Sequence, residues 1–179
     1  TLPTLWNDDE RYISGYLAAF DGYYLTGDGG LIDEDGYLFV MGRTDDVLNV
    51  AGHRLSTGSI EAALAGHPDV AECAVIGVAD DFKGQIPRGL VVLKAGIDPE
   101  TEGERITKEL VQRVRNEVGA VAALRQVDVV PALPKTRSGK ILRKTMREIA
   151  DGKTPAIPGT IEDASVLDLI GDTLRNTHH

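Results

Sequence analysis

The sequence is poor in cysteine, lacks long apolar runs and carries no excess of positive charge. Cys73 is the only cysteine among the 179 residues, so a domain stapled by internal disulfides is excluded. No run approaches the roughly 18 apolar residues that a membrane span needs. Three acids occupy residues 8–10, where a secretory signal would carry basic residues. What remains is the ordinary composition of a globular chain, with 42% hydrophobic and 26% charged residues.

The formal net charge is −9, which disfavours nucleic acid as the main partner. The charge is unevenly distributed, because residues 1–103 are strongly acidic and residues 104–153 carry an excess of Lys and Arg. This basic block fits two interpretations, a solvated helix face or a binding site for an anion.

The residue pattern predicts an α+β fold. A β-hairpin is expected over 23–42, with turns at 27–30 and 33–36, and a second hairpin over 47–55 with Gly52 at its tip. The remaining expected elements are short helices over 60–64, 141–150 and 165–174, a longer helix over 104–118, and strands over 70–78, 90–93 and 126–130. The chain begins at Thr1 and ends in His178 and His179, which we interpret as cut or engineered ends with a tag remnant.

Three segments could carry chemistry. Residues 26–28 read Thr-Gly-Asp at a strand end, where a carboxylate can accept two hydrogen bonds from a ribose diol or can serve as a turn residue. Residues 42–46 read Gly-Arg-Thr-Asp-Asp, either a charged hinge or a solvated strand start. Residues 133–140 read Leu-Pro-Lys-Thr-Arg-Ser-Gly-Lys, a flexible loop of three cations and two hydroxyls that suits phosphate or carboxylate.

Other chemistries find little support. The third segment is not a P-loop, because the required glycine-to-lysine spacing is absent, and no His/Cys spacing indicates structural zinc. Cys73 lies in an apolar run, which is typical of a buried small residue. His53 is expected on an exposed hairpin and His67 at a helix end.

Taken together, the segments at 24–28, 42–55 and 133–140 resemble the acyl-CoA synthetases of the adenylate-forming superfamily. The resemblance covers residues 16–152, and the acetyl- and propionyl-CoA synthetases are the most similar branch, with residues 160–167 nearer the propionyl type. It implies a three-stranded sheet with flanking helices and a hairpin, in a small mobile C-terminal domain. Residues 1–44 would end the large N-terminal domain, residues 45–152 would form the small domain, and residues 153–179 would form a tail.

The resemblance also implies an activity. Such enzymes activate a carboxylate with ATP and Mg²⁺, release pyrophosphate, and pass the acyl group from the adenylate to the thiol of coenzyme A. The small domain swings about a hinge between the two half-reactions. By this resemblance Lys140 is catalytic, and Asp45 is the hinge. The remaining implied ligand residues are Asp28, Arg43 and Arg54 for ATP or AMP, and Ala51, Gly52 and Arg115 for coenzyme A.

Further expectations follow from the same resemblance. His67 and the carbonyl groups of Ala65 and Val70 match positions that hold a cation in some relatives. Lys140 is a candidate for regulatory acetylation. Ala51 stands where many relatives have serine, so a hydroxyl contact to coenzyme A is lost. The location implied is the cytoplasm, or the mitochondrial matrix in a eukaryote.

No phosphate-binding loop or acyl pocket precedes Thr26, so we interpret the chain as an inactive C-terminal piece whose partner is the missing N-terminal domain. Two alternatives stay open. One is a stand-alone module that binds a nucleotide or a partner without catalysis. The other is a different adenylating enzyme, such as a peptide-synthetase module, although no carrier domain follows.

Overall fold

The computed structural model describes residues 2–155 and 157–175, with the backbone alone at positions 41, 42 and 45. His178 and His179 lie outside the described residues. The chain divides into two compact units, Thr1–Asp45 and Asp46–His179. Within the described ranges, no helix is long and apolar enough to cross a membrane.

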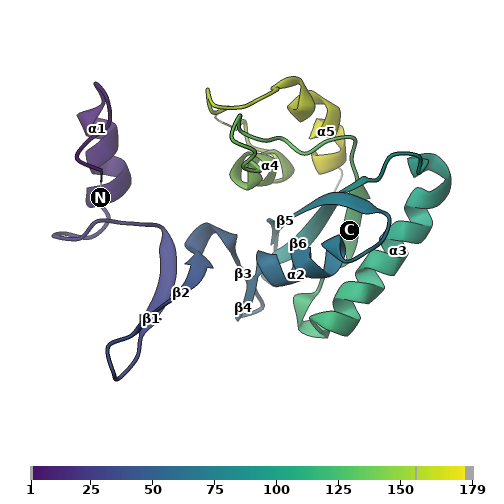
Figure 1. The fold of residues 1–179 in the computed structure, drawn as a ribbon, viewed down its shortest axis with the longest axis horizontal. Coiled ribbons are helices and arrows are strands. Elements are labelled where there is room, and N and C mark those ends of the chain that lie inside the picture. Colours follow the sequence, from purple (N-terminus) through teal and green to yellow (C-terminus); the bar gives the residue numbers. More distant parts are fainter. Residues whose placement is uncertain (1, 156, 176–179) are drawn as a thin grey trace. The chain divides into compact units, whose positions relative to one another are not determined.

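The first unit holds a helical start and a β-hairpin (Figure 1). Helix α1 (Asp9–Tyr12) continues into a π-helical turn (Ile13–Leu17), and strand β1 (Asp28–Ile32) pairs antiparallel with β2 (Leu38–Arg43). This confirms the hairpin, whereas the turn expected at 27–30 is wrong, because residues 28–30 belong to β1. The chain turns at Asp33, whose carboxylate accepts the amides of Asp35 and Tyr37 at 3.0 and 2.8 Å.

Residues 23–25 are not a strand, although their residue types favour one. The ring of Tyr24 stacks on that of Tyr16 with centroids 5.1 Å apart, and the amide of Leu25 donates to the carbonyl oxygen of Tyr16. These contacts hold the segment against the helical start, so they override the local β propensity.

The second unit is built on one sheet. Strands β5 (Val70–Asp80) and β6 (Gly84–Leu93) form a long antiparallel hairpin, and β7 (Gln126–Val129) pairs parallel with the later half of β6. The hairpin of β3 (Val47–Val50) and β4 (His53–Ser56) joins the start of β6 through Val50 and Gly84. The expected three-stranded sheet with an added hairpin is therefore confirmed.

Helices cover both faces of this sheet (Figure 1). The cluster that contains Val75 and Val91 packs beneath α2 (Thr57–Ala65) and α3 (Pro99–Glu117). The alternating neighbours, such as Ala74 and Leu90, pack beneath α4 (Arg143–Ala150) and α5 (Ser165–Arg175). Successive strand residues point to opposite faces, so one pair of strands supports both halves of the core.

Local signals set the helix boundaries. Helix α3 begins five residues before its predicted start, because Asp98 caps it by accepting the amide of Glu100 at 2.9 Å and Pro99 occupies the first turn. Ser56 caps α2 in the same way through the amide of Gly58. A short 3₁₀ turn, Ala120–Ala122, follows α3 and leads to β7.

Candidate functional site

In the first unit, the structure brings Asp28 and Arg43 together. They face one another across β1 and β2, and both side chains are exposed. The guanidinium of Arg43 donates to the carbonyl oxygen of Thr26 at 3.3 Å. A Cβ at Gly27 would lie 3.0 Å from Arg43 Nη2, and Gly27 has a φ of +77°, so glycine permits this close approach. Asp28 and Arg43 thus occupy paired positions at the first residue of β1 and the last residue of β2.

The predicted hinge, Asp45, lies in a 3₁₀ turn at Thr44–Asp46. The division between the two compact units falls directly after this residue. Its side chain lies outside what the structure describes.

The hairpin of β3 and β4 turns through two left-handed residues. Ala51 has a φ of +49° and Gly52 a φ of +85°, the backbone of a type I′ turn. A Cβ built on Gly52 meets nothing within 4 Å, so the tip of the hairpin is open. Arg54 follows on β4, opposite Asn49, and is exposed.

Beside this tip lies a cleft of about 400 Å³ with three cationic side chains at its wall. Arg115 from α3 is the predicted one, whereas sequence reasoning missed Lys83 and Arg125. The amide of Ala51 donates to the carbonyl oxygen of Lys83 at 3.0 Å, which connects the hairpin tip to the cleft. The apolar part of the lining comes from Val111, Val114, Ala122 and Leu124.

Lys140 lies on a tight turn rather than on the flexible loop that its sequence suggests. Lys135 and Ile141 form an antiparallel bridge, and the amide of Thr136 donates to the carbonyl oxygen of Lys140 at 2.8 Å. The hydroxyl of Thr136 accepts the amide of Lys140 at 3.1 Å, and Gly139 supplies the left-handed φ of +82°. These bonds order the backbone on both sides of the lysine.

The cations of this turn differ in their surroundings. The ammonium of Lys135 is paired with the carboxylate of Glu72 at 2.6 Å. Lys140 is exposed and, among the residues that the structure describes, has no ion-pair partner. Lys140 is thus open to an external anion, whereas Lys135 anchors the base of the turn to β5.

The hairpin tip and the base of the lysine turn are attached to opposite ends of the hairpin that β5 and β6 form. The tip adjoins Gly84 at the first residue of β6, and Glu72 pairs with Val92 near its last residue. A strand of this length extends roughly 30 Å at about 3.3 Å per residue. The hairpin tip and the turn that carries Lys140 therefore lie well apart. Figure 1 shows the same separation between the β3–β4 hairpin and α4, the helix that follows the lysine turn.

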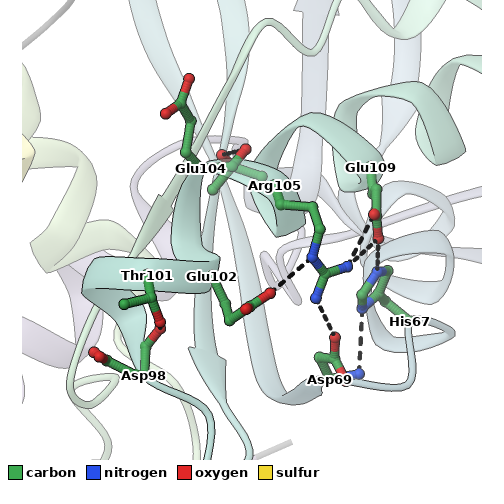
Figure 2. Close-up of polar contacts among 9 residues, drawn as sticks. His67, Asp69, Asp98, Thr101, Glu102, Glu104, Arg105 and Glu109 are labelled. Atoms are coloured by element: carbon green, nitrogen blue, oxygen red, sulfur yellow. Dashed lines mark hydrogen bonds and ion pairs between the residues drawn. The ribbon is translucent and has the colours of Figure 1, made fainter.

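The ring of His67 is fully engaged (Figure 2). The side chain is 7% exposed, its Nε2 lies 3.0 Å from Oε2 of Glu109, and its Nδ1 accepts the amide of Asp69 at 3.2 Å. Its carbonyl oxygen accepts the amide of Val70 at 3.2 Å. In the described part of the chain, no group of three or more His, Cys, Asp or Glu side chains could hold a metal ion.

Arg105 extends this polar cluster along α3 (Figure 2). Its guanidinium contacts Glu102, Glu109 and Asp69 at 2.8 to 3.3 Å. The hydrogen bond from His67, followed by that from Arg105, lowers the pKa of Glu109 from its ordinary value. The cluster joins α3 to the turn between α2 and β5, which gives part of the basic block a structural role.

Cys73 lies in β5, as its sequence context suggests, and is half-buried. Burial raises the pKa of its thiol to about 11, with the Glu61 charge adding to the effect. The thiol donates to the carbonyl oxygen of Glu61. The thiolate is therefore scarce at neutral pH.

Comparison with known proteins places this geometry in a family. The model of the AMP-binding enzyme C-terminal domain matches residues 59–140. An uncharacterized protein of Pseudomonas aeruginosa is 56% identical over 172 residues, which are 96% of this chain and 27% of that protein. Acetyl-coenzyme A synthetase of Penicillium chrysogenum is 47% identical over 175 residues, 97% of this chain and 26% of the relative.

A further sequence relative and a solved structure are also similar to this chain. Human acyl-CoA synthetase short-chain family member 3, mitochondrial, is 47% identical over 171 residues, 96% of this chain and 25% of the relative. The crystal structure of ATP-bound MatB from Rhodopseudomonas palustris matches with a TM-score of 0.62 and 26% identity, over 83% of this chain and 28% of that one. The chain spans about a quarter of the length of the curated relatives it matches.

The sheet with helices on both faces is thus a fold that this chain shares with the solved structure of ATP-bound MatB. Residues 59–140 thus match the AMP-binding enzyme C-terminal domain, and nearly the whole chain is homologous to acetyl-CoA synthetase and to short-chain acyl-CoA synthetases.

Proposed function

We propose that the chain is the C-terminal part of an AMP-forming acyl-CoA synthetase that activates a short-chain carboxylate. A carboxylate oxygen attacks the α-phosphorus of ATP, the bond to the β-phosphate oxygen breaks, and pyrophosphate leaves. The thiol of coenzyme A, after losing its proton, then attacks the acyl carbon and releases AMP. The observation that carries this proposal is the attachment of the lysine turn and the glycine hairpin at opposite ends of the β5–β6 hairpin.

In the first half-reaction, Lys140 has the catalytic role. The attack brings two anions together, and an ammonium that bridges the carboxylate and phosphoryl oxygens offsets the developing charge. An exposed lysine on an ordered turn, with no ion-pair partner in the described ranges, suits that role. We assign Asp28 and Arg43 to the ribose hydroxyls, since they face one another across the hairpin, and Arg54 to the nucleotide phosphate.

In the second half-reaction, the hairpin tip and the cleft bind coenzyme A. Ala51 and Gly52 lack bulky side chains and leave open space for the pantetheine arm. Arg115 lines the adjoining cleft, where a phosphate of coenzyme A would meet its guanidinium. The bond from Ala51 to Lys83 keeps these parts of the site in register.

Lys140 and the Ala51–Gly52 hairpin lie too far apart to reach one reaction centre together. The small domain must therefore move between the two half-reactions. We propose that residues 45–152 swing about Asp45 relative to a large domain that residues 1–44 complete, and that residues 153–179 follow the small domain. Supporting this, the boundary between the compact units adjoins Asp45. The partner is then the N-terminal domain of the same protein.

We propose that His67 and the carbonyl oxygens of Ala65 and Val70 hold a cation, and that Mg²⁺ binds together with the phosphates of ATP. Both ring nitrogens of His67 are already bonded, so the carbonyl oxygen is the donor that we favour at this residue. Bound there, the ion would add positive charge near the turn that follows α2.

The identity of the acyl substrate and the cellular location of the reaction are also proposals. We favour propionate over acetate because of residues 160–167, and we place the reaction in the cytoplasm or, in a eukaryote, in the mitochondrial matrix. Acetylation of Lys140 would remove its charge and block the first half-reaction.

The test uses the full-length protein that contains this chain. Acetate, propionate and butyrate are each offered with ATP, Mg²⁺ and coenzyme A, and pyrophosphate and acyl-CoA are quantified. The proposal expects both products, with the highest kcat/KM for propionate, and no turnover by the 179-residue chain alone. A full-length protein that binds AMP without activating any of the three acids would instead favour the module without catalysis.

A further inference from the structure

A segment beyond the family match lies directly against the turn that carries Lys140. Thr136 and Ile161 form an antiparallel bridge. The amide of Arg137 donates to the carbonyl oxygen of Thr160 at 3.0 Å, and the amide of Glu162 donates to the carbonyl oxygen of Lys135 at 2.9 Å. Both backbone contacts join positions about 25 residues apart in the sequence.

The lysine turn is therefore bonded on two sides. On one side Lys135 bridges to Ile141 and Thr136 bonds to Lys140. On the other side residues 160–162 occupy the edge of the same short strand, whose amides and carbonyl groups would otherwise face water. The backbone of Lys140 is bonded to the short strand at residues 135–136. Its position therefore also depends on residues 160–162, which pair with the other edge of that strand.

The segment is itself anchored by α5. Leu167, Ile170 and Leu174 are buried and pack with α4 and β5 in the core. The guanidinium of Arg88, only 1% exposed, donates to the carbonyl oxygen of Leu174 at 2.7 Å and to that of Thr173 at the end of α5. Its Nε donates to the carboxylate of Asp128 at 2.7 Å.

The charge of Arg88 suits this place. The last carbonyl groups of a helix lack partners within the helix and carry partial negative charge, which a buried cation satisfies. Asp128 on β7 balances the charge of Arg88, so a central strand, an edge strand and the C-terminal helix meet at one ion pair. Helix α5 is thereby fixed to the sheet rather than loosely attached.

We propose that residues 158–175, the C-terminal strap, position Lys140 for the first half-reaction. The strap acts through backbone bonds to the lysine turn and touches no substrate, so its residues are positioning residues. The inference rests on the catalytic role proposed for Lys140. A reacting group displaced by about 1 Å can lose roughly a hundredfold in rate, which makes a second row of backbone bonds consequential.

One substitution can remove a single backbone hydrogen bond between the strap and the lysine turn, the bond from the Glu162 amide to the Lys135 carbonyl oxygen. Glu162→Pro removes the amide hydrogen that bonds to Lys135, whereas Glu162→Ala keeps it. The Glu162 side chain is exposed and has no hydrogen-bond or ion-pair partner in the described part of the chain, which makes the alanine variant a matched control.

Two half-reactions are measured in the full-length protein that contains this chain. Adenylation is followed by pyrophosphate release, and thioester formation is started from pre-formed acyl-adenylate. In Glu162→Pro we expect adenylation to fall at least about tenfold, with thioester formation within about twofold of wild type. Glu162→Ala should match wild type in both. Equal losses in both half-reactions, or none, would overturn the proposal.

Amide hydrogen exchange on the 179-residue chain tests the strap without activity. The Arg137 amide should be protected in wild type and in Glu162→Ala, and should exchange at least about tenfold faster in Glu162→Pro. An unprotected Arg137 amide in wild type would contradict the strap even if Glu162→Pro failed to fold. A full-length wild type that shows no adenylation, although the Arg137 amide is protected, would instead contradict the proposed function and leave the backbone contacts of the strap established.

Discussion

The amide of Ala51 donates to the carbonyl oxygen of Lys83 at 3.0 Å, and this bond joins the β3–β4 hairpin to the β5–β6 hairpin. Lys83 belongs to the wall of the cleft that Arg115 lines. A small-residue tip and a cationic cleft therefore form one continuous surface. The cations of this surface suit the negative charge of the coenzyme A that we propose as its ligand.

The cleft leads to a prediction about Arg115. In the full-length protein, Arg115→Ala should raise KM for coenzyme A about tenfold or more, as expected for the loss of a charge-assisted contact of about 1.5–3 kcal/mol. The KM for ATP should stay unchanged. Steady-state kinetics with each substrate varied gives both constants.

Lys108→Ala is the control for this experiment, because Lys108 is an exposed cation of the same helix, paired with Glu104 and outside the cleft wall. Similar increases in KM for coenzyme A in both variants would point to the general charge of α3 and contradict the assignment of Arg115.

The hairpin tip makes a second prediction, about stability. Gly52→Ala places a Cβ at a φ of +85°, which should lower the free energy of unfolding by about 1–2 kcal/mol. Ala51→Gly, at a φ of +49°, removes such a Cβ and should not lower it. Urea denaturation of the 179-residue chain measures both values, and equal destabilisation by the two variants would argue against the left-handed turn.

The polar cluster of Figure 2 predicts acid sensitivity. Hydrogen bonds from His67 and Arg105 lower the pKa of Glu109 below its ordinary 4.5, so folding favours the charged carboxylate. The resulting stabilisation is present above 4.5 and is lost as the pH falls through the lowered value. Glu109→Gln should therefore cost stability near neutral pH and progressively less in acid.

Denaturation by urea at several pH values between about 3 and 7 tests this dependence. Glu162→Gln removes an exposed carboxylate outside the cluster and serves as the control. A loss in Glu109→Gln that is the same at every pH would show that the ionised carboxylate is not what stabilises the cluster.

Local patterns predicted much of the fold. The second hairpin is recognisable because glycine at its tip favours the left-handed turn, and α3 is recognisable from its apolar spacing. Its start at Pro99 was missed by five residues, although Asp98 and Pro99 are a readable capping signal. Successive residues of β5 point to opposite faces of the sheet, so the apolar run in this strand accounts for a core on each face.

What the sequence could not reveal depends on contacts between distant segments. Lys83 lies between β5 and β6, and the fold brings it to the wall of the cleft that Arg115 from α3 also lines. The ordering of the lysine turn depends on residues 160–162, and that of α5 depends on Arg88, far away in the chain. No periodicity or turn signal encodes such pairings, so the resemblance identified Lys140 without indicating what holds it.

The most direct test of the proposed function is the pair of half-reactions in Lys140→Ala, made in the full-length protein that contains this chain. If Lys140 offsets charge only during attack on ATP, pyrophosphate release should fall by at least about a hundredfold. The attack of coenzyme A on pre-formed acyl-adenylate should stay within about threefold of wild type. Equal loss of both half-reactions, or undiminished pyrophosphate release, would contradict the account.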